Sequence, residues 1–143
     1  MAIKQITVFV ENRQGSLVSI TRALSENNVN IRALSIADTK DFGILRLIVN
    51  DEAVAEKTLK ENGYLIKVTD VVGVKIGDAP GKLTAALEVL DRAGINMEYL
   101  YAFMARTEKH AYVVLRVEDN AVAESALTNA GFKMISEADI NKL

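Results

Sequence analysis

The sequence predicts an α+β protein built from two copies of one βαββαβ unit in tandem, each with an antiparallel sheet and both helices on one face. The first observation is an internal repeat: NRQGSLVSITRALSENNVNI, which begins at Asn12, resembles DAPGKLTAALEVLDRAGINM, which begins at Asp78. The second is that apolar residues change from alternating to helical spacing in the same order in both copies. The repeat is too long for a solenoid and therefore indicates a duplicated domain.

The first copy begins with a strand that leads into a helix. Residues 6–10, ITVFV, have the alternation of a strand. Gly15 interrupts this pattern, and a helix is predicted from about Ser16 because apolar residues then recur at helical spacing. The Asn27–Asn28 pair is expected to end the helix, since asparagine tolerates the left-handed conformation. The apolar residues of this helix are Leu17, Ile20 and Leu24.

The remainder of the first copy has the pattern of two strands, a second helix and a fourth strand. NIRALSIAD and GILRLIVND predict the second and third strands. Asp51 predicts the N-cap of a helix that Gly63 ends, and YLIKV then predicts the closing strand. The apolar face of this helix is predicted at Val54, Thr58 and Leu59.

The second copy repeats the order of the first. A helix follows Gly81, the segments NMEYLYAFM and AYVVLRVED predict strands, and FKMIS predicts the closing strand. Asp119 predicts the cap of a helix that Gly131 ends, with an apolar face at Val122, Ala126 and Leu127. This copy has extra residues, and the polar stretch 106–109 is the expected site of the insertion because turns tolerate added residues.

The predicted domains are residues 1–68 and 69–143. No linker separates them, because KVTDVVGVKI continues from the last strand of one copy into the first strand of the next, with only Thr69 and Asp70 interrupting the strand pattern. The element order in each copy is the split βαβ, or ferredoxin-like, arrangement. Right-handed crossovers then place both helices on one face of the sheet.

Apolar residues also occur on the sheet face that the helices would leave bare. In the third strand of each copy, Ile44 and Ile48, and likewise Tyr112 and Val114, alternate with the residues expected to face the helices. A contiguous apolar face implies that something covers it. A second copy of the chain, giving a homodimer, is the simplest cover, and burial by sheet twist at the strand ends is the alternative.

Composition and charge exclude several functional classes. Acids and bases are interspersed, the net charge is −2 and the pI is near 5.5, so neither a nucleic-acid partner nor a membrane partner is expected. The chain has no cysteine, which excludes disulfides, thiolate metal sites and thiol nucleophiles. The start of the chain has the pattern of a strand, and no apolar run approaches the ~20 residues of a membrane span. A cytoplasmic protein without metal or cofactor is therefore expected.

Each copy places a small polar residue and a glycine between its first strand and first helix. The first amides of a helix have no partners within it, and the helix dipole favours a carboxylate there. Gly15 and Gly81 lack a Cβ, so a ligand could approach the backbone closely. Asn12 offers an amide, and Asp78 offers a carboxylate that could accept an ammonium group. This pattern predicts a site for a free α-amino acid.

The pattern of a small polar residue, Pro-Gly-x-Leu, an amphipathic helix and Ile/Val-Asn resembles the ACT domain family. DAPGKL…LDRAGINM and NRQGSL…SENNVNI carry the resemblance, which covers the whole chain as two ACT-like units. It implies binding of amino acids or related small molecules at interfaces between units, and regulation of metabolic enzymes. The implied ligand contacts are Asn12, Gln14, Gly15, Ser16, Leu17 and Asn30 in the first copy, and Asp78, Ala79, Pro80, Gly81, Lys82, Leu83 and Asn96 in the second.

Purely structural roles for these residues stay open. Glycine is common at strand-to-helix turns for conformational reasons, and the small polar residues before it could form Asx turns with their own backbone. Asn30 and Asn96 could cap helix ends. Gln14 stands where the second copy has Pro80, which fixes φ and stiffens its turn, so the two turns are expected to differ in what they hold.

His110 and the aromatic residues of one predicted strand are the other candidates for chemistry. His110 has no second histidine or cysteine to complete an ordinary zinc site, and no acid–base constellation surrounds it. Tyr99, Tyr101 and Phe103 alternate along a predicted strand and could stack on bases. The basic surroundings of an RNA-binding sheet are missing, so packing in a core or interface is favoured for these aromatic residues.

The function predicted from the sequence is a non-catalytic protein of two ACT-like domains that binds a small molecule, most readily an amino acid. It would act as a sensor or regulatory subunit, with a metabolic enzyme as the candidate partner. The first alternative is a ligand-free structural subunit that dimerises within a metabolic enzyme complex. The second alternative is a small enzyme that depends on His110.

Overall fold

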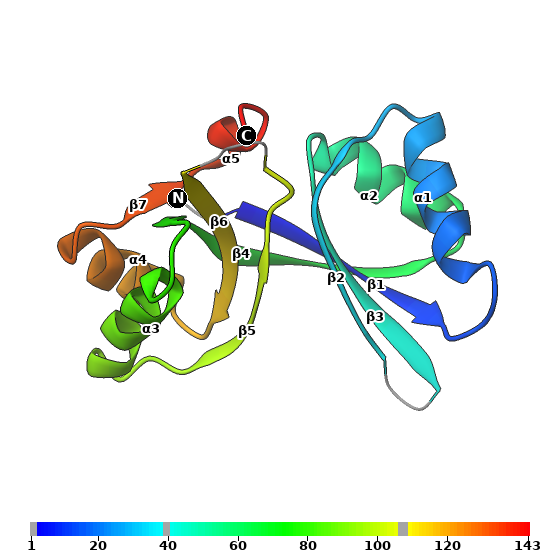
Figure 1. Cartoon of the computed structure of the whole chain (residues 1–143). Coiled ribbons are helices and arrows are strands. Elements are labelled where there is room, and N and C mark those ends of the chain that lie inside the picture. The colour runs from blue at the N-terminus through cyan, green and yellow to red at the C-terminus, as the bar shows by residue number, and fades with distance from the viewer. Residues whose placement is uncertain (1–2, 39–40, 106–108) are drawn as a thin grey trace. The chain divides into compact units, whose positions relative to one another are not determined.

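The computed structural model describes residues 3–38, 41–105 and 109–143, which form helices and strands in the order drawn in Figure 1. The chain divides into two compact units, one of Lys4–Thr69 and one of Ile3 with Asp70–Leu143. The elements are β1 (Ile3–Glu11), α1 (Ser16–Glu26), β2 (Ile31–Asp38), β3 (Phe42–Val49), α2 (Glu52–Glu61), β4 (Leu65–Gly77), α3 (Lys82–Arg92), β5 (Met97–Ala102), β6 (His110–Val117), α4 (Asn120–Asn129), β7 (Lys133–Ile135) and α5 (Glu137–Ile140).

The first unit has the predicted βαββαβ order. Its strands lie in the order β2-β3-β1-β4, and β3 pairs antiparallel with both β1 and β2. Val8 lies opposite Leu45 and Ile6 opposite Leu47, so these four side chains point to the same face of the sheet. Helices α1 and α2 contact each other and cover that face (Figure 1).

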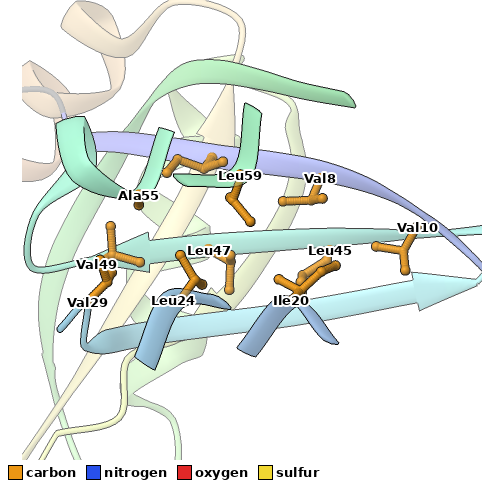
Figure 2. Close-up of a cluster of buried hydrophobic side chains, with 11 residues drawn as sticks. Val8, Val10, Ile20, Leu24, Val29, Leu45, Leu47, Val49, Ala55 and Leu59 are labelled. Atoms are coloured by element: carbon orange, nitrogen blue, oxygen red, sulfur yellow. The ribbon is translucent and has the colours of Figure 1, made fainter. Parts of the chain in front are cut away.

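The core of the first unit lies between this sheet face and its two helices. Figure 2 shows side chains of α1 and α2 directed toward those of β1 and β3. Helix α1 contributes Ile20 and Leu24, and α2 contributes Ala55 and Leu59, all of them buried. The predicted apolar face of α2 was wrong at Val54, which is exposed, whereas Ala55 is buried. The predicted face did not include alanine, although this small residue packs well where a helix approaches a sheet.

The second unit repeats the architecture. Its strands lie in the order β7-β4-β6-β5, and β4 pairs antiparallel with both β6 and β7. Its core includes Ala86 and Leu90 of α3, and Ala123 and Leu127 of α4. The predicted face of α4 was wrong at Val122, which is exposed, whereas its neighbour Ala123 is buried, as with Val54 and Ala55 in the first copy. The short helix α5, which begins with a capping box formed by Ser136 and Asp139, was not predicted.

The predicted ends of the helices are confirmed. The Asp51 carboxylate accepts a hydrogen bond from the Val54 amide at 3.2 Å, and Asp119 caps α4 in the same way at 3.2 Å. Gly63 and Gly131 adopt φ of 81° and 94° just after α2 and α4, as expected for residues that end a helix in the left-handed conformation. Asn28 follows α1 with a φ of 58°.

Two features of the strands differ from or extend the prediction. Strand β4 runs from Leu65 to Gly77 without the interruption expected at Thr69 and Asp70, and its residues belong to both units. Threonine is a good strand former, and a single aspartate does not break an extended backbone. Of the expected insertion at 106–109, residues 106–108 lie outside the described residues.

The strand faces turned away from the helices are partly buried. Ile48 and Val114 are buried but belong to neither helix–sheet core, whereas Ile44 and Tyr112 are half-buried. The predicted alternation of apolar side chains toward both faces of the third strands is therefore present. Their cover by a second copy of the chain stays a prediction.

Truncation of the two leucines of α1 is expected to change the stability of the protein by different amounts. Leu24 is fully buried, so Leu24→Ala should lower the free energy of unfolding by about 2–5 kcal/mol through lost burial and a residual cavity. Leu17 is 39% exposed, and Leu17→Ala should cost less than about 1 kcal/mol. Urea denaturation of both variants measures the difference, and equal losses would contradict the described packing of α1.

Removal of a helix cap is expected to destabilise the first unit moderately. Asp51→Ala should lower the free energy of unfolding by about 1 kcal/mol, because the Val54 amide loses its acceptor at the start of α2. Asp51→Ser, which keeps an oxygen acceptor at the cap, should restore most of that stability in the same denaturation experiment. A serine variant as unstable as the alanine variant would show that the hydrogen bond is not the cause.

Candidate functional site

The two turns that lead into α1 and α3 have the same backbone geometry. Gly15 is the N-cap of α1 with φ 86° and ψ −10°, and Gly81 is the N-cap of α3 with φ 88° and ψ −9°. The Ser16 amide donates to the Arg13 carbonyl at 3.3 Å, and the Lys82 amide donates to the carbonyl three residues before it at 3.2 Å. The replacement of Pro80 by Gln14 therefore leaves the backbone of the turn unchanged.

Neither helix has a side chain over its first amides. A glycine in the left-handed conformation occupies each N-cap, and no side-chain hydrogen bond caps α1 or α3. A Cβ placed on Gly15 or Gly81 would meet no atom within 4 Å. The predicted open space beside these helix ends is present. The first amide of each helix donates within the turn, and each end presents the positive end of the helix dipole without a side-chain cap.

A cavity of 610 Å³ lies beside the first turn, between the end of β1, the start of α1 and the turn from α2 to β4. Of the residues predicted for this site, Gln14, Gly15 and Ser16 line the cavity, whereas Asn12 and Leu17 do not. The full lining is Phe9, Val10, Glu11, Arg13, Gln14, Gly15, Ser16, Ser19, Asn62, Gly63, Tyr64 and Leu65.

Polar groups from three elements meet in this first cavity. The Tyr64 hydroxyl donates to Ser19 Oγ at 2.8 Å, which joins the start of β4 to α1. Arg13 and Glu11 form an ion pair of 3.2 Å between largely exposed side chains, so the lining carries no net charge from this pair. Ser19 and Tyr64 were not among the predicted site residues. A signal for this turn exists in the sequence, because Asn-Gly-Tyr at 62–64 recurs as Ala-Gly-Phe at 130–132.

An equivalent cavity of 440 Å³ lies in the second unit, between the ends of β4 and α4 and the start of α3. Among the residues predicted for the second turn, Lys82 lines it, whereas Asp78, Ala79, Pro80, Gly81 and Leu83 do not. Asp78 is exposed, and its backbone amide donates to the Lys109 carbonyl at 3.1 Å. The lining is Lys75, Ile76, Gly77, Lys82, Ala85, His110, Gly131, Phe132 and Lys133.

The asparagines predicted to join these sites lie away from the turns. Asn30 follows the C-terminal end of α1, and the 11 residues of that helix separate it from Gly15 by about 16 Å. Its amide donates to Asn50 Oδ1 at 2.8 Å, and its carbonyl accepts from the Asn50 amide at 3.0 Å, which gives it a structural role. Asn96 follows α3 in the same way and lines a separate hollow beside Glu98 and Glu118.

Among the residues that the structure describes, two carboxyl groups have a lowered pKa, and both lie outside the first cavity. Hydrogen bonds from the Ser136 backbone and side chain lower the pKa of Asp139 at the start of α5. A hydrogen bond from Lys60, at 2.8 Å, is the main cause that lowers the pKa of Glu56 on α2. Both shifts accompany local structure at helices and give no sign of an acid–base pair.

The described residues contain neither a candidate membrane-spanning helix nor a candidate metal cluster. Over 3–38, 41–105 and 109–143, no helix is long and apolar enough to cross a membrane. Within the same ranges, no cluster of histidine, aspartate and glutamate side chains has the arrangement of a metal site.

Comparison with known proteins gives one relative with a named function and several solved structures. The acetolactate synthase small subunit of Aquifex aeolicus (strain VF5) is 35% identical over 75 residues, which are 48% of this chain and 39% of that protein. The chain thus matches well under half of the length of this relative.

The solved structures cover the chain more fully. A crystal structure of a Bacteroides thetaiotaomicron protein matches 100% of this chain and 98% of its own, with a TM-score of 0.93 and 36% identity. The ligand-free regulatory subunit of aspartate kinase from Thermus thermophilus covers 90% of this chain and 91% of its own, with a TM-score of 0.67 and 17% identity, and so shares the fold.

The family comparison spans both repeats. Residues 1–143 match the family model described as an ACT domain pair, which confirms the resemblance carried by the two glycine turns and the predicted ferredoxin-like fold class. Because this match includes the whole of both copies, the chain belongs to the ACT domain pair family.

Proposed function

We propose that this protein is a non-catalytic sensor or regulatory subunit that binds a free amino acid in the cavity of its first unit. The observation that carries the proposal is the meeting of an uncapped helix N-terminus with hydroxyl and amide side chains around one 610 Å³ cavity. The positive end of the α1 helix dipole suits the ligand carboxylate. Gly15 leaves the space for it to approach.

The remaining groups of the first cavity suit a zwitterion. The Glu11 carboxylate is within reach of the cavity and can accept an ammonium group, while Arg13 balances its charge. Ser16, Ser19 and Tyr64 place hydroxyls around the same space and can orient the ligand by hydrogen bonds. An amino acid with a polar side chain would use these hydroxyls, whereas an aliphatic one would leave some of them unpaired.

Regulation would follow from binding that differs between two states of the protein. A ligand shifts an equilibrium only by its differential affinity for the two states. A synthase small subunit and a kinase regulatory subunit occur among the proteins that this chain resembles. By this analogy, the partner of the chain is a cytoplasmic enzyme of amino-acid metabolism, bound by a homodimer of the chain.

A ligand-free dimerisation subunit is the second candidate, and exposed apolar side chains on two elements favour it. Helix α1 and strand β2 carry apolar side chains that are incompletely buried, and Val18 and Ile36 are 51% and 52% exposed. Strand β2 is also at the end of the strand order, where its backbone can pair with another strand. This candidate predicts that a charge at Ile36 disrupts self-association while changes in the first cavity do not affect it.

A thermal-shift screen of the common amino acids tests the binding proposal. A ligand present at about tenfold its dissociation constant should stabilise the folded protein by about 1.4 kcal/mol. The double substitution Ser19→Ala and Tyr64→Phe, which imports the residues that the second copy carries at these positions, should weaken binding about fivefold or more by removing two hydroxyls. Ser125→Ala on the exposed face of α4 is the control.

The outcomes of this screen separate the two candidates. Stabilisation by an amino acid that the double variant loses and the control retains supports the sensor. No stabilisation by any amino acid, together with loss of self-association on Ile36→Lys, would establish the structural subunit instead.

Substitution of the first-turn glycine is expected to affect both stability and binding. Gly15→Ala should lower the free energy of unfolding by about 1–2 kcal/mol, because φ is 86° at this position. It should also weaken amino-acid binding, since the added methyl group faces the open cavity. Gly43→Ala is the control, because Gly43 has no left-handed φ and an added Cβ would make ordinary contacts at 3.7 Å or more. Unchanged affinity in Gly15→Ala would place the ligand away from this turn.

A further inference from the structure

The cavity of the second unit occupies the same place as the first cavity but has different charges. The corresponding positions follow from the internal repeat and from the two linings. Phe9, Ser16 and Leu65 of the first cavity correspond to Lys75, Lys82 and Lys133 of the second. The second cavity also lacks the carboxylate of Glu11, because Gly77 stands at the corresponding position.

We infer that the second cavity binds a small dianion, of the phosphate or dicarboxylate class, and that it does not hold a zwitterionic amino acid. The inference rests on the proposed function only in treating the two cavities as ligand sites. The residues that line the second cavity determine its chemistry. One chain would then carry two ligand sites of different specificity on the same duplicated backbone.

The absence of a side chain at Gly77 makes room for the side chain of Lys82. A Cβ built on Gly77 would lie 3.1, 3.2 and 3.3 Å from Cγ, Cδ and Cε of Lys82. The aliphatic part of the lysine therefore lies against the bare backbone of Gly77. In the first copy, Glu11 and Ser16 stand at these positions, and no such packing is needed. The glycine and the lysine thus form a matched pair at the second site.

Two further lysines are held side by side. Lys75 of β4 and Lys133 of β7 are directly opposite each other in the antiparallel register, and like charges in this arrangement repel. Neither forms an ion pair with a carboxylate of the described residues. A bound anion would relieve this repulsion, whereas the bound ammonium group of an amino acid would increase it.

The surroundings of the lysine pair keep the local charge positive. Lys75 and Lys133 also line a neighbouring hollow of 210 Å³ that includes Lys142 and Asp139. The Asp139 carboxylate already accepts hydrogen bonds from the Ser136 amide at 3.0 Å and from Ser136 Oγ at 2.9 Å. It therefore offsets only part of the charge of the three lysines.

The remaining lining of the second cavity also disfavours an amino acid. Among the described residues, no acidic side chain lines this cavity, so none of them offers a carboxylate to an ammonium group. Ala85 and Phe132 replace the serine and tyrosine that form a hydrogen bond across the first cavity. His110, opposite Gly77 in the register of β4 and β6, adds a ring that can donate a hydrogen bond to an anion.

Titration of the protein of residues 1–143, followed by two-dimensional ¹H–¹⁵N NMR, tests this inference. Inorganic phosphate and succinate are the two dianion probes, and their separate titrations show which source of negative charge the site prefers. Saturable shifts are expected at the amides of Gly77 and Gly131, which line the second cavity, and not at Gly15 and Gly63, which line the first. Free glycine is the zwitterion control and should leave Gly77 and Gly131 unshifted.

Two substitutions copied from the first repeat locate the site. Lys82→Ser and Lys133→Leu should each weaken binding of the better probe about fivefold to tenfold, because each removes one charged contact. Lys67→Ser is the matched control, since Lys67 is an exposed lysine of the same strand β4 outside the cavity. Added sodium chloride should weaken binding further through screening.

Several outcomes would overturn the inference. Shifts that do not saturate, or an equal loss of affinity in Lys67→Ser and Lys82→Ser, would show general attraction of anions to surface lysines. Saturable glycine binding at the second cavity would assign it to zwitterions instead. An amino acid that binds the first cavity leaves the proposed function intact in each of these cases, because the two cavities report through different glycine amides.

Discussion

The left-handed conformation of one glycine at the start of each first helix is the constraint on which both units depend. Gly15 and Gly81 adopt φ of 86° and 88°, a region that residues with a side chain rarely enter. This conformation turns the chain from a strand directly into a helix within a few residues. It also leaves the first helical amides without a side-chain cap, so the same residue sets the path of the backbone and the open end of the helix.

The packing of each unit follows from that turn. Once the helix begins at Ser16, Ile20 and Leu24 fall on the side that meets Leu45 and Leu47 of β3. Gly15, Ser16 and Gly63 contribute little side-chain volume to the lining of the cavity beside the turn, which helps to keep that space open. A core close-packed along the middle of the helix and an open space at its tip are consequences of the same arrangement.

Duplication preserved the backbone of this arrangement and changed the side chains around it. The turn has the same dihedral angles in both units although Gln14 stands in one and Pro80 in the other. Around it, the first copy keeps hydroxyl groups and a Glu11–Arg13 ion pair, whereas the second carries lysines. Because the backbone supplies the shape and the side chains supply the charge, the two corresponding cavities share a backbone and differ in charge.

Features that depend on neighbours in the sequence could be predicted from it. The helix starts at Ser16 and Lys82, the caps at Asp51 and Asp119, and the stop at Gly63 each depend on a few adjacent residues, and the repeat supplied every one of them twice. The assignment of helix faces was less successful, because Val54 and Ala55 are both apolar and only the approach of the sheet determines which one is buried.

The sequence by itself determined the duplicated fold and the position of the glycine turns, since periodicity, caps and left-handed glycines act over a few residues. Only the tertiary structure decided which side chains surround each turn. Tyr64 meets Ser19 across 45 residues of chain, and Lys133 meets Lys75 through strand pairing. It also separated Asn30 and Asn96 from the turns by the length of a helix. Contacts of this kind depend on how distant strands and helices are brought together, which no local pattern of residues specifies.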